Sequence, residues 1–386
     1  MNMAGGTAQA DPHRRVPPEQ TLARVRPLLA RLGITRVGVL TGLDTVGIPV
    51  AAAYRPNSRS IAVHQGKGRS LAAAKVSAVM EALECWHAET ADPLLRLATA
   101  DEIARHGDAV AADRLPLTGR ADPLTTRLLW TEAVDIAASR PVWVPFEMVS
   151  ADFTIPAPAG FGVFRQTTNG LACGNERVEA ILQGLYEVVE RDAVARWQGA
   201  APEAQAACGV DAASVDGASS RWLLERFAQA GVAVRIWDVT TEIGLPAFMA
   251  LACDADGVAG VEPEFGAGCH AVADVALARA LAEAAQARVT RISGARDDFP
   301  PRSFDTDARA ARHAAAQRFM RMTPTRAFQA VRGADSAEAD LDAALRRLGR
   351  AGFSQVACVD LTRTDIGIPV ARIIIPGVQG AFEGDA

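Results

Sequence analysis

A pattern that occurs three times constrains the fold of this 386-residue chain more than any other feature of its sequence. Each copy joins two apolar runs through a polar turn, and a Gly-x-Pro triplet lies where the second run begins. The copies occupy residues 36–50, 234–247 and 356–370. Glycine and proline between apolar runs mark turns, and a proline early in a strand removes a donor that the ladder does not yet need. The pattern predicts three hairpins, antiparallel or mixed sheets, and an α+β fold.

Alanine-rich stretches with helical periodicity separate the hairpins and predict five long helices. They cover residues 70–89, 176–198, 219–229, 275–292 and 307–322. A shorter helix is expected at 19–32, bent at Pro27 and closed by Gly33. Residues 122–140 predict a further hairpin or loop–strand unit. Residues 300–302 predict a linker, and the helix beyond it is expected to present a solvated face.

Composition and charge exclude several classes of protein. The chain is 49% hydrophobic and 22% charged, as globular proteins are, and its formal net charge of −5 does not favour a nucleic-acid partner. No signal-peptide core and no apolar run of membrane-spanning length occur, which predicts a cytoplasmic protein without a membrane partner. Six cysteines occur without a C-x-x-C pair, a usage typical of reduced, buried thiols and not of disulfides or a zinc site.

Three of the expected helices carry the same polar signature, in which successive polar residues are four and then three positions apart. Residues with these spacings lie on one side of a helix, so each set should form a polar stripe. The stripes are Ser77, Glu81 and Glu84; Gln183, Glu187 and Glu190, with Arg191 next; and Arg279, Glu283 and Gln286, with Arg288 beyond. A single Glu pair of this kind is usually a solvated face, but three matched helices favour a shared site.

The residues around these stripes leave little room for a solvated face. Leu83 and Trp86 flank the first pair of carboxylates, and Val188 and Val189 flank the second. Carboxylates gathered in apolar surroundings repel one another, and their pKa values rise. A divalent cation removes this cost, and oxygen ligands from two helices suit Mg²⁺ together with phosphate oxygens. The sequence therefore predicts a site for Mg²⁺ and phosphate groups.

A glycine-containing loop is expected before each of these helices, at residues 65–70, 169–175 and 266–270. Glycine lets backbone amides approach an anion, and a helix N-terminus adds partial positive charge. Lys67 is expected to add a point charge for a phosphate, although one such loop alone is more typical of a turn. No G-x-x-x-x-G-K-[ST] and no kinase motif set occurs, which excludes a P-loop protein and a protein kinase.

Taken in order, these motifs closely resemble those of the YcaO family. The resemblance is carried by Gly66-Lys67-Gly68 with the first stripe, by residues 169–191, and by residues 280–298. It runs over nearly the whole chain. It implies a YcaO-type α+β fold in which sheets and helices surround an ATP site unrelated to the P-loop. It also implies two parts: residues 1–35, an N-terminal extension and helix that contribute to the nucleotide site, and residues 36–386, the catalytic domain.

The resemblance further implies a role for individual residues at a site that holds ATP and Mg²⁺. It assigns contacts with the metal and phosphates to Glu81, Glu84, Glu179, Glu187 and Glu190. It assigns nucleotide contacts to Arg14, Thr21, Ser77, Asn175, Arg191, Gln286 and Arg288. It identifies no general base. Where the family's first block often ends in Glu-Arg, this chain has Glu84-Cys85.

Within the family, residues 41–50 and Ile375-Pro376-Gly377 resemble the branch that works with a TfuA partner protein and forms thioamides. This branch implies ATP-dependent activation of a peptide backbone amide by O-phosphorylation, with a peptide or protein substrate and a sulfur donor. Two alternatives remain: an azoline-forming cyclodehydratase of ribosomal peptides, and a non-catalytic nucleotide-binding accessory factor for a sulfur-transfer enzyme. Azoline-forming members commonly end in Pro-x-Pro-x-Pro, which residues 382–386 lack. The apolar helices are compatible with a homodimer.

Overall fold

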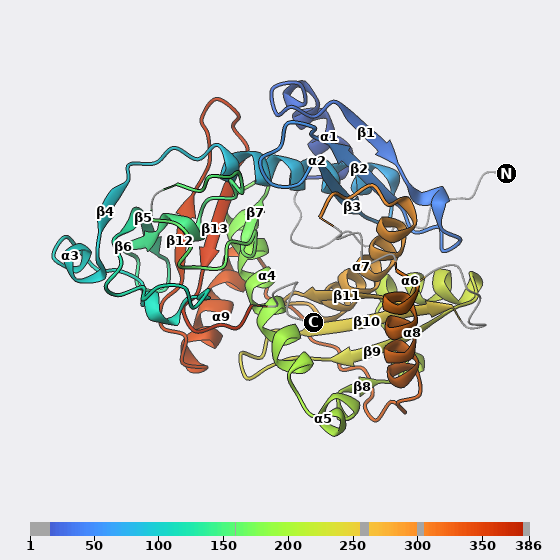
Figure 1. Ribbon diagram of the computed structural model, residues 1–386. Coiled ribbons are helices and arrows are strands. Elements are labelled where there is room, and N and C mark those ends of the chain that lie inside the picture. Colours follow the sequence, from blue (N-terminus) through green and yellow to red (C-terminus); the bar gives the residue numbers. More distant parts are fainter. Residues whose placement is uncertain (1–15, 159, 255–261, 299–304, 381–386) are drawn as a thin grey trace.

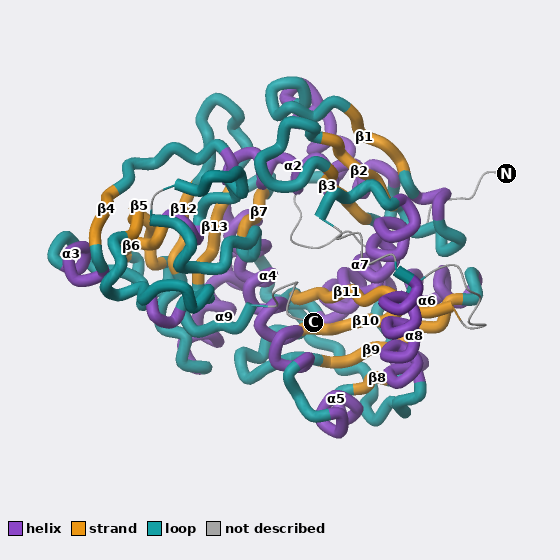
Figure 2. The backbone as a smooth tube through the Cα atoms, viewed as in Figure 1, coloured by secondary structure: helices purple, strands orange, loops and turns teal. Residues whose placement is uncertain are grey.

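The computed structural model describes residues 16–158, 160–254, 262–298 and 305–380, and it contains three sheets with helices packed around them (Figure 1, Figure 2). The first sheet has the order β1 (Arg36–Val39), β2 (Val50–Tyr54), β3 (Val63–Lys67). The second has the order β11 (Glu264–Cys269), β10 (Ala247–Asp254), β9 (Val232–Asp238), β8 (Gly209–Val210). The third has the order β4 (Arg96–Ala98), β5 (Leu128–Asp135), β12 (Ala357–Asp360), β13 (Val370–Ile374), β7 (Leu171–Cys173), and β6 (Arg140–Pro145) also pairs with β5. The named strands pair antiparallel, which confirms the predicted α+β class.

The described helices are α1 (Pro18–Val25), α2 (Leu71–Glu89), α3 (Ala100–Ala104), α4 (Arg177–Gln198), α5 (Pro202–Ala207), α6 (Ala218–Gln229), α7 (Ala273–Ser293), α8 (Thr306–Met320) and α9 (Ala337–Arg350). The five long predicted helices are confirmed as α2, α4, α6, α7 and α8, each within two residues at both ends. The bend predicted at Pro27 is a change from α1 into a 3-10 turn over Arg26–Leu28. The linker predicted at residues 300–302 lies outside the described residues. None of the described helices combines the length and hydropathy needed to cross a membrane.

The three repeated segments form hairpins as predicted, namely β1–β2, β9–β10 and β12–β13. The Gly-x-Pro triplet lies in the connection of each hairpin, and the second strand begins directly after the proline, at Val50, Ala247 and Val370. The three glycines have nearly the same left-handed backbone, with φ of +70° at Gly47, +74° at Gly244 and +71° at Gly367. Because residues with a side chain rarely adopt this conformation, glycine is what allows the turn to be repeated.

Each hairpin gains a third strand that leads into a long helix. In the first and second units the chain runs on directly, from β2 through β3 into α2 and from β10 through β11 into α7. The third hairpin instead pairs with β7, from the middle of the chain, which leads into α4; Val370 of β13 lies opposite Cys173. Figure 1 shows this meeting of distant segments, with β13 in red beside β7 in green. The helices α2, α4 and α7 therefore occupy equivalent positions in three units.

Two segments predicted to be anion-binding loops are strands whose glycines pack against helices. An ideal Cβ on Gly66 of β3 would lie 2.0 Å from the backbone nitrogen of Ala78 in α2. An ideal Cβ on Gly266 of β11 would lie 2.2 Å from the backbone nitrogen of Ala284 in α7. No side chain fits in either place, so these glycines bring strand and helix into close contact. Gly66 and Gly266 therefore lie in strands and not in the loops that were predicted to bring backbone amides close to an anion.

The helix α4 lies at the centre of the largest apolar core. Its buried residues, among them Leu185 and Val189, pack with residues of the second and third sheets and with Leu348 of α9. Smaller cores join α2 to the first sheet and α7 to the second. On α8, Ala316 and Phe319 are buried and most other residues are exposed or half-buried, which confirms the solvated face predicted for that helix.

Candidate active site

The polar stripes of α2, α4 and α7 join the three units into a ring. The last residue of each stripe forms a hydrogen bond with the strand that leads into another of the three helices: α2 contacts β7, α4 contacts β11, and α7 contacts β3. Glu84 Oε1 accepts from the Cys173 amide of β7 at 2.8 Å, and Glu190 Oε2 accepts from the Cys269 amide of β11 at 3.1 Å. Gln286 Nε2 donates to a backbone carbonyl of β3 at 3.3 Å and closes the ring. The three stripes are thereby fixed relative to one another.

The middle residue of the α7 stripe is neutralised by a lysine. Lys67 Nζ lies 2.7 Å from Glu283 Oε2, because Lys67 ends β3, which packs on α2 and also contacts α7. Burial opposes ionisation of Glu283, but Lys67 and then Arg191 outweigh it and hold the pKa of this carboxyl below its ordinary value. Lys67, which is predicted to add a point charge for a phosphate, is paired in this structure with Glu283. Glu283 belongs to the third predicted stripe, but no individual role was predicted for it.

Burial disfavours the ionised form of the carboxylates on α2 and α4. Burial raises the pKa of Glu84 to about 8, and the negative charges of Glu187 and Glu81 add to the shift. Burial raises the pKa of Glu187 to about 7, although Arg191 opposes it. Burial and the charge of Glu283 also raise the pKa of Glu190. Glu84 and Glu187 still keep some exposed area, so an ion can reach them.

This cluster of buried carboxylates fits a divalent cation. Mg²⁺ takes few protein carboxylates and completes its coordination with water and phosphate oxygens. Across the described part of the chain, no group of three or more His, Cys, Asp or Glu side chains could hold an ion. Mg²⁺ bound with a nucleotide takes part of its coordination from phosphate oxygens. The individual metal contacts of Glu81, Glu84, Glu179, Glu187 and Glu190 stay predictions.

Three residues predicted to contact the nucleotide or its phosphates lie together at the N-terminus of α4. Thr21 Oγ1 donates to Asn175 Oδ1 at 3.1 Å, and the Asn175 amide donates to Glu179 Oε2 at 2.8 Å. Glu179 Oε1 is buried and has no hydrogen-bond partner among the described residues. Because an unpaired buried carboxylate oxygen is unfavourable, this atom is a good candidate to meet a bound cation. Arg14 lies outside the described residues.

The remaining predicted nucleotide contacts divide into two groups. Ser77 and Arg191 are half-buried on the stripes of α2 and α4. Arg288 is only 1% exposed, and its guanidinium is 2.9 Å from Asp44 and 3.1 Å from Asp254. These ion pairs hold Arg288 between α7 and the connection of the β1–β2 hairpin, so the structure does not support the nucleotide contact predicted for it.

Two buried basic residues beside the stripes escaped the sequence analysis. Arg372 on β13 is 1% exposed and donates to two backbone carbonyls. Burial lowers its pKa to about 10, while the nearby charge of Glu187 favours its ionised form. A charge inside the apolar strand Val370–Ile374 was the one signal that could have identified it. His64 is fully buried on β3, next to Glu81.

The fold and the site together define a class of protein. It has three sheet–helix units, its helices bring carboxylates together in a site suited to Mg²⁺ and phosphate groups, and it has no P-loop motif. The chain belongs to the YcaO family. The family model that matches residues 65–379 is described as YcaO cyclodehydratase, ATP- and Mg²⁺-binding, which identifies ATP and Mg²⁺ as the cofactors.

Two relatives match nearly the whole chain. An uncharacterized protein in the tfuA 3′ region of Rhizobium leguminosarum bv. trifolii is 36% identical over 382 residues, which cover 96% of this chain and 90% of that protein. A protein of Methanothermobacter thermautotrophicus is 34% identical over 375 residues, which cover 94% of each.

Solved structures share the fold. YcaO from Methanopyrus kandleri, bound with AMPPCP and Mg²⁺, matches with a TM-score of 0.74 and 25% identity over 95% of this chain and 92% of that one. A heterocyclase in complex with substrate and cofactor matches with a TM-score of 0.77 and 21% identity, over 98% of this chain and 54% of that one. The family supports an ATP-dependent enzyme of the cyclodehydratase type, and the neighbours support its fold.

The raised pKa values of Glu84 and Glu187 predict how the stability of the metal-free protein depends on pH. Between about 4.5, the ordinary pKa of Glu, and the folded values of about 7 and 8, the folded state binds more protons than the unfolded state. The free energy of unfolding should therefore fall as pH rises through this window, by at least about 1 kcal/mol given ~1.4 kcal/mol per pKa unit. Urea unfolding at several pH values measures it.

The control for this prediction is Glu84→Gln, which removes one of the two titrating groups and should flatten the dependence. Saturating Mg-ATP should also reduce the slope, because the cation stabilises the ionised carboxylates. An unchanged slope in Glu84→Gln would show that Glu84 is ionised throughout the range.

Proposed function

We propose that this chain activates a peptide backbone amide by ATP-dependent O-phosphorylation and forms a thioamide, with a sulfide donor and a TfuA-type partner protein. The observation that carries the phosphoryl chemistry of the proposal is the cluster of buried carboxylates on α2 and α4, which suits Mg²⁺ together with phosphate oxygens. The partner is supported by the relative in the tfuA 3′ region, which is 36% identical over 96% of the chain.

The chemistry needs no nucleophile from the protein. A backbone amide is a poor electrophile, and its oxygen is a poor leaving group. Hydrosulfide adds to the carbonyl carbon, and the resulting oxyanion takes the γ-phosphoryl group of ATP with release of ADP. The carbon–oxygen bond then breaks and phosphate leaves, while sulfur loses its proton and forms the C=S bond. Each step balances with hydrosulfide and ATP as the only co-reactants.

The contribution of the protein is alignment and charge. Bound Mg²⁺ would supply positive charge to the phosphates, and the carboxylates of α2 and α4 would hold it. Arg191, next to Glu190 at the centre of the site, would stabilise negative charge on the transferring phosphoryl group. Thr21 and Asn175, already hydrogen-bonded to each other, would orient the nucleotide at the N-terminus of α4. This arrangement acts mainly by preorganisation, which is the principal term in phosphoryl transfer.

Azoline formation is the second candidate function. It uses the same phosphorylation, but a Cys, Ser or Thr side chain of the peptide adds to the carbonyl in place of sulfide. The similarity to heterocyclase structures favours it. The third candidate, an accessory factor without catalysis, predicts nucleotide binding but no turnover.

Mass spectrometry of the peptide product separates these candidates. The purified chain is incubated with Mg-ATP, sulfide, a TfuA-type partner and a panel of peptides. Exchange of oxygen for sulfur adds mass and supports the proposal, whereas loss of one water indicates an azoline. Glu132→Gln, at an exposed carboxylate of β5, is the matched control for Glu187→Gln and should retain activity. Bound nucleotide without turnover under every condition would favour the accessory role.

A further inference from the structure

We infer that His64 is a positioning residue for Glu81: its neutral imidazole directs the Nδ1 proton at the Glu81 carboxylate and orients that carboxylate toward the metal. The inference rests on the proposed function in one respect, the role of Glu81 as a metal ligand. It adds a residue that belongs to no helix stripe and lies on a strand.

Strand geometry places His64 opposite Glu81. Alternate residues of a strand point to the same face, so His64 shares a face of β3 with Gly66. An ideal Cβ on Gly66 would touch the backbone of Ala74 and Ala78, which shows that this face packs directly on α2. His64 comes two residues earlier and therefore lies over the next turn of the helix, which carries Glu81. The distance from His64 Nδ1 to Glu81 Oε1 is 3.9 Å.

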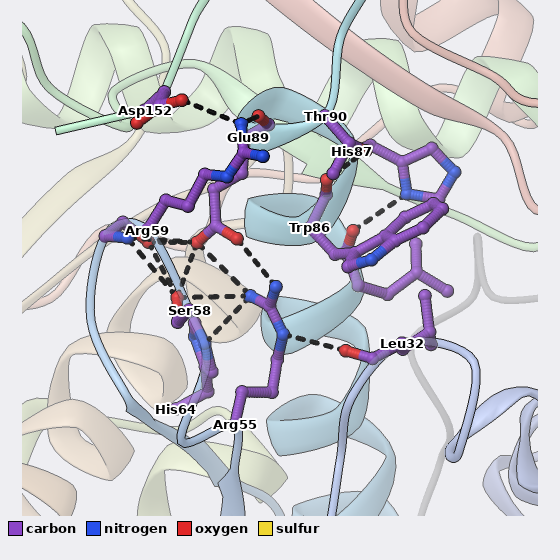
Figure 3. Close-up of polar contacts among 12 residues, drawn as sticks. Leu32, Arg55, Ser58, Arg59, His64, Trp86, His87, Glu89, Thr90 and Asp152 are labelled. Atoms are coloured by element: carbon purple, nitrogen blue, oxygen red, sulfur yellow. Dashed lines mark hydrogen bonds and ion pairs between the residues drawn. The ribbon is translucent and has the colours of Figure 1, made fainter. Parts of the chain in front are cut away.

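The other ring nitrogen of His64 faces a buried arginine. His64 Nε2 lies 3.4 Å from Arg55 Nη1. Figure 3 shows Arg55 between His64 and Glu89. Arg55 donates to Glu89 from Nη2 at 2.6 Å and from Nη1 at 3.3 Å. Hydroxyls of Ser58 and Ser60 also donate to Glu89 Oε1, at 2.5 and 2.6 Å. This network, at the C-terminal end of α2, is buried and holds the arginine in place.

The arginine decides which nitrogen of His64 carries the proton. A guanidinium stays charged in proteins and has donors but no acceptor. His64 Nε2 can therefore meet Arg55 favourably only as an acceptor, without a proton. In a neutral imidazole the proton then lies on Nδ1, which makes Nδ1 a donor. His64 is 0% exposed, so its ring is shielded from bulk solvent.

Among the described residues, Glu81 places a carboxylate oxygen beside His64 Nδ1. Nδ1 is buried and has no hydrogen-bond partner among the described residues. At 3.9 Å the Glu81 oxygen is about 1 Å beyond an ordinary hydrogen bond, and the Glu81 side chain is 35% exposed and can move. When one Glu81 oxygen accepts from His64, the other remains for a cation. Partners of this kind commonly change metal affinity by about 10–100-fold.

The test compares two replacements that each keep one of the two ring nitrogens. His64→Asn places an amide nitrogen near Nδ1, and His64→Gln places its amide near Nε2. Binding of Mn²⁺ is measured by electron paramagnetic resonance in the presence of a non-hydrolysable ATP analogue. We expect His64→Gln to weaken Mn²⁺ binding by about tenfold or more, and His64→Asn to restore most of the wild-type affinity. Glu81→Gln is measured in parallel.

A second readout does not depend on any variant folding well. In ¹⁵N-histidine-labelled wild-type protein, the nitrogen shifts of the His64 ring should report a neutral imidazole protonated at Nδ1. A proton on Nε2, or equal loss of Mn²⁺ affinity in both variants, would overturn the inference. So would unchanged affinity in both while Glu81→Gln weakens binding. Unchanged affinity in Glu81→Gln itself would instead reject Glu81 as a ligand, and with it the role of His64.

Discussion

Replacing Glu81 and Glu187 together with glutamine should abolish detectable Mg-ATP binding, which corresponds to a loss of more than about 100-fold. The two residues belong to different helices, α2 and α4, and both charges act on Glu84. Glutamine preserves shape and removes the negative charge that would compensate the cation. Titration calorimetry of Mg-ATP into the wild type and the double variant measures the difference.

Stability should change in the opposite direction from binding. Burial raises the pKa of Glu187 to about 7, which means that ionised Glu187 lowers the free energy of unfolding of the metal-free protein. Glutamine is neutral and removes this destabilisation. The double variant should therefore unfold at an equal or higher urea concentration than the metal-free wild type. Glu132→Gln with Glu225→Gln makes the same change in net charge at exposed positions and should bind Mg-ATP normally. Retained binding in the Glu81, Glu187 variant would overturn the assignment of these carboxylates.

Replacing Gly66 with alanine should destabilise the first unit by about 3 kcal/mol, at the upper end of the usual range for overpacking. The new methyl group would lie 2.0 Å from the Ala78 nitrogen and 2.4 Å from the Ala74 carbonyl oxygen. Both atoms belong to the backbone of α2, which cannot give way as a flexible side chain can. Since α2 carries Glu81 and Glu84, Mg-ATP binding should be lost as well.

The matched control is Gly349→Ala. Gly349 lies near the end of α9, and an added Cβ there meets nothing within 4 Å. Alanine at this position should stabilise the protein by about 0.5–1 kcal/mol, because it restricts the unfolded chain and favours helix. Urea unfolding followed by circular dichroism measures both variants. A midpoint for Gly66→Ala equal to that of the wild type would show that α2 can move away from β3.

The predictable parts of the fold are those set by local signals. Helical periodicity located α2, α4 and α7 within about two residues, and the Gly-x-Pro triplets located three hairpins, because both signals depend on neighbours in sequence. The same kind of signal was present for α9, which begins after the capping residue Ser336 and has an apolar stripe, yet the sequence analysis passed over it.

The site was predictable to the extent that it lies on helix stripes. Spacings of four and three gather Glu81 with Glu84 and Glu187 with Glu190 on their own helices, whatever the helices pack against. The partners of charged residues across elements were not predictable in this way. Lys67 binds Glu283 and Arg288 binds Asp44, and each pair joins residues more than 200 positions apart.

By itself, then, the sequence determined the local elements, the oxygen-rich character of the site and the family to which the chain belongs. The tertiary structure alone decided how the units close into a ring, in which β12–β13 from the end of the chain completes the sheet that leads into α4. It also decided which charges are neutralised and which remain buried and unpaired. The physical reason is that periodicity and turn chemistry act over a few residues, whereas desolvation and ion pairing depend on which surfaces finally meet.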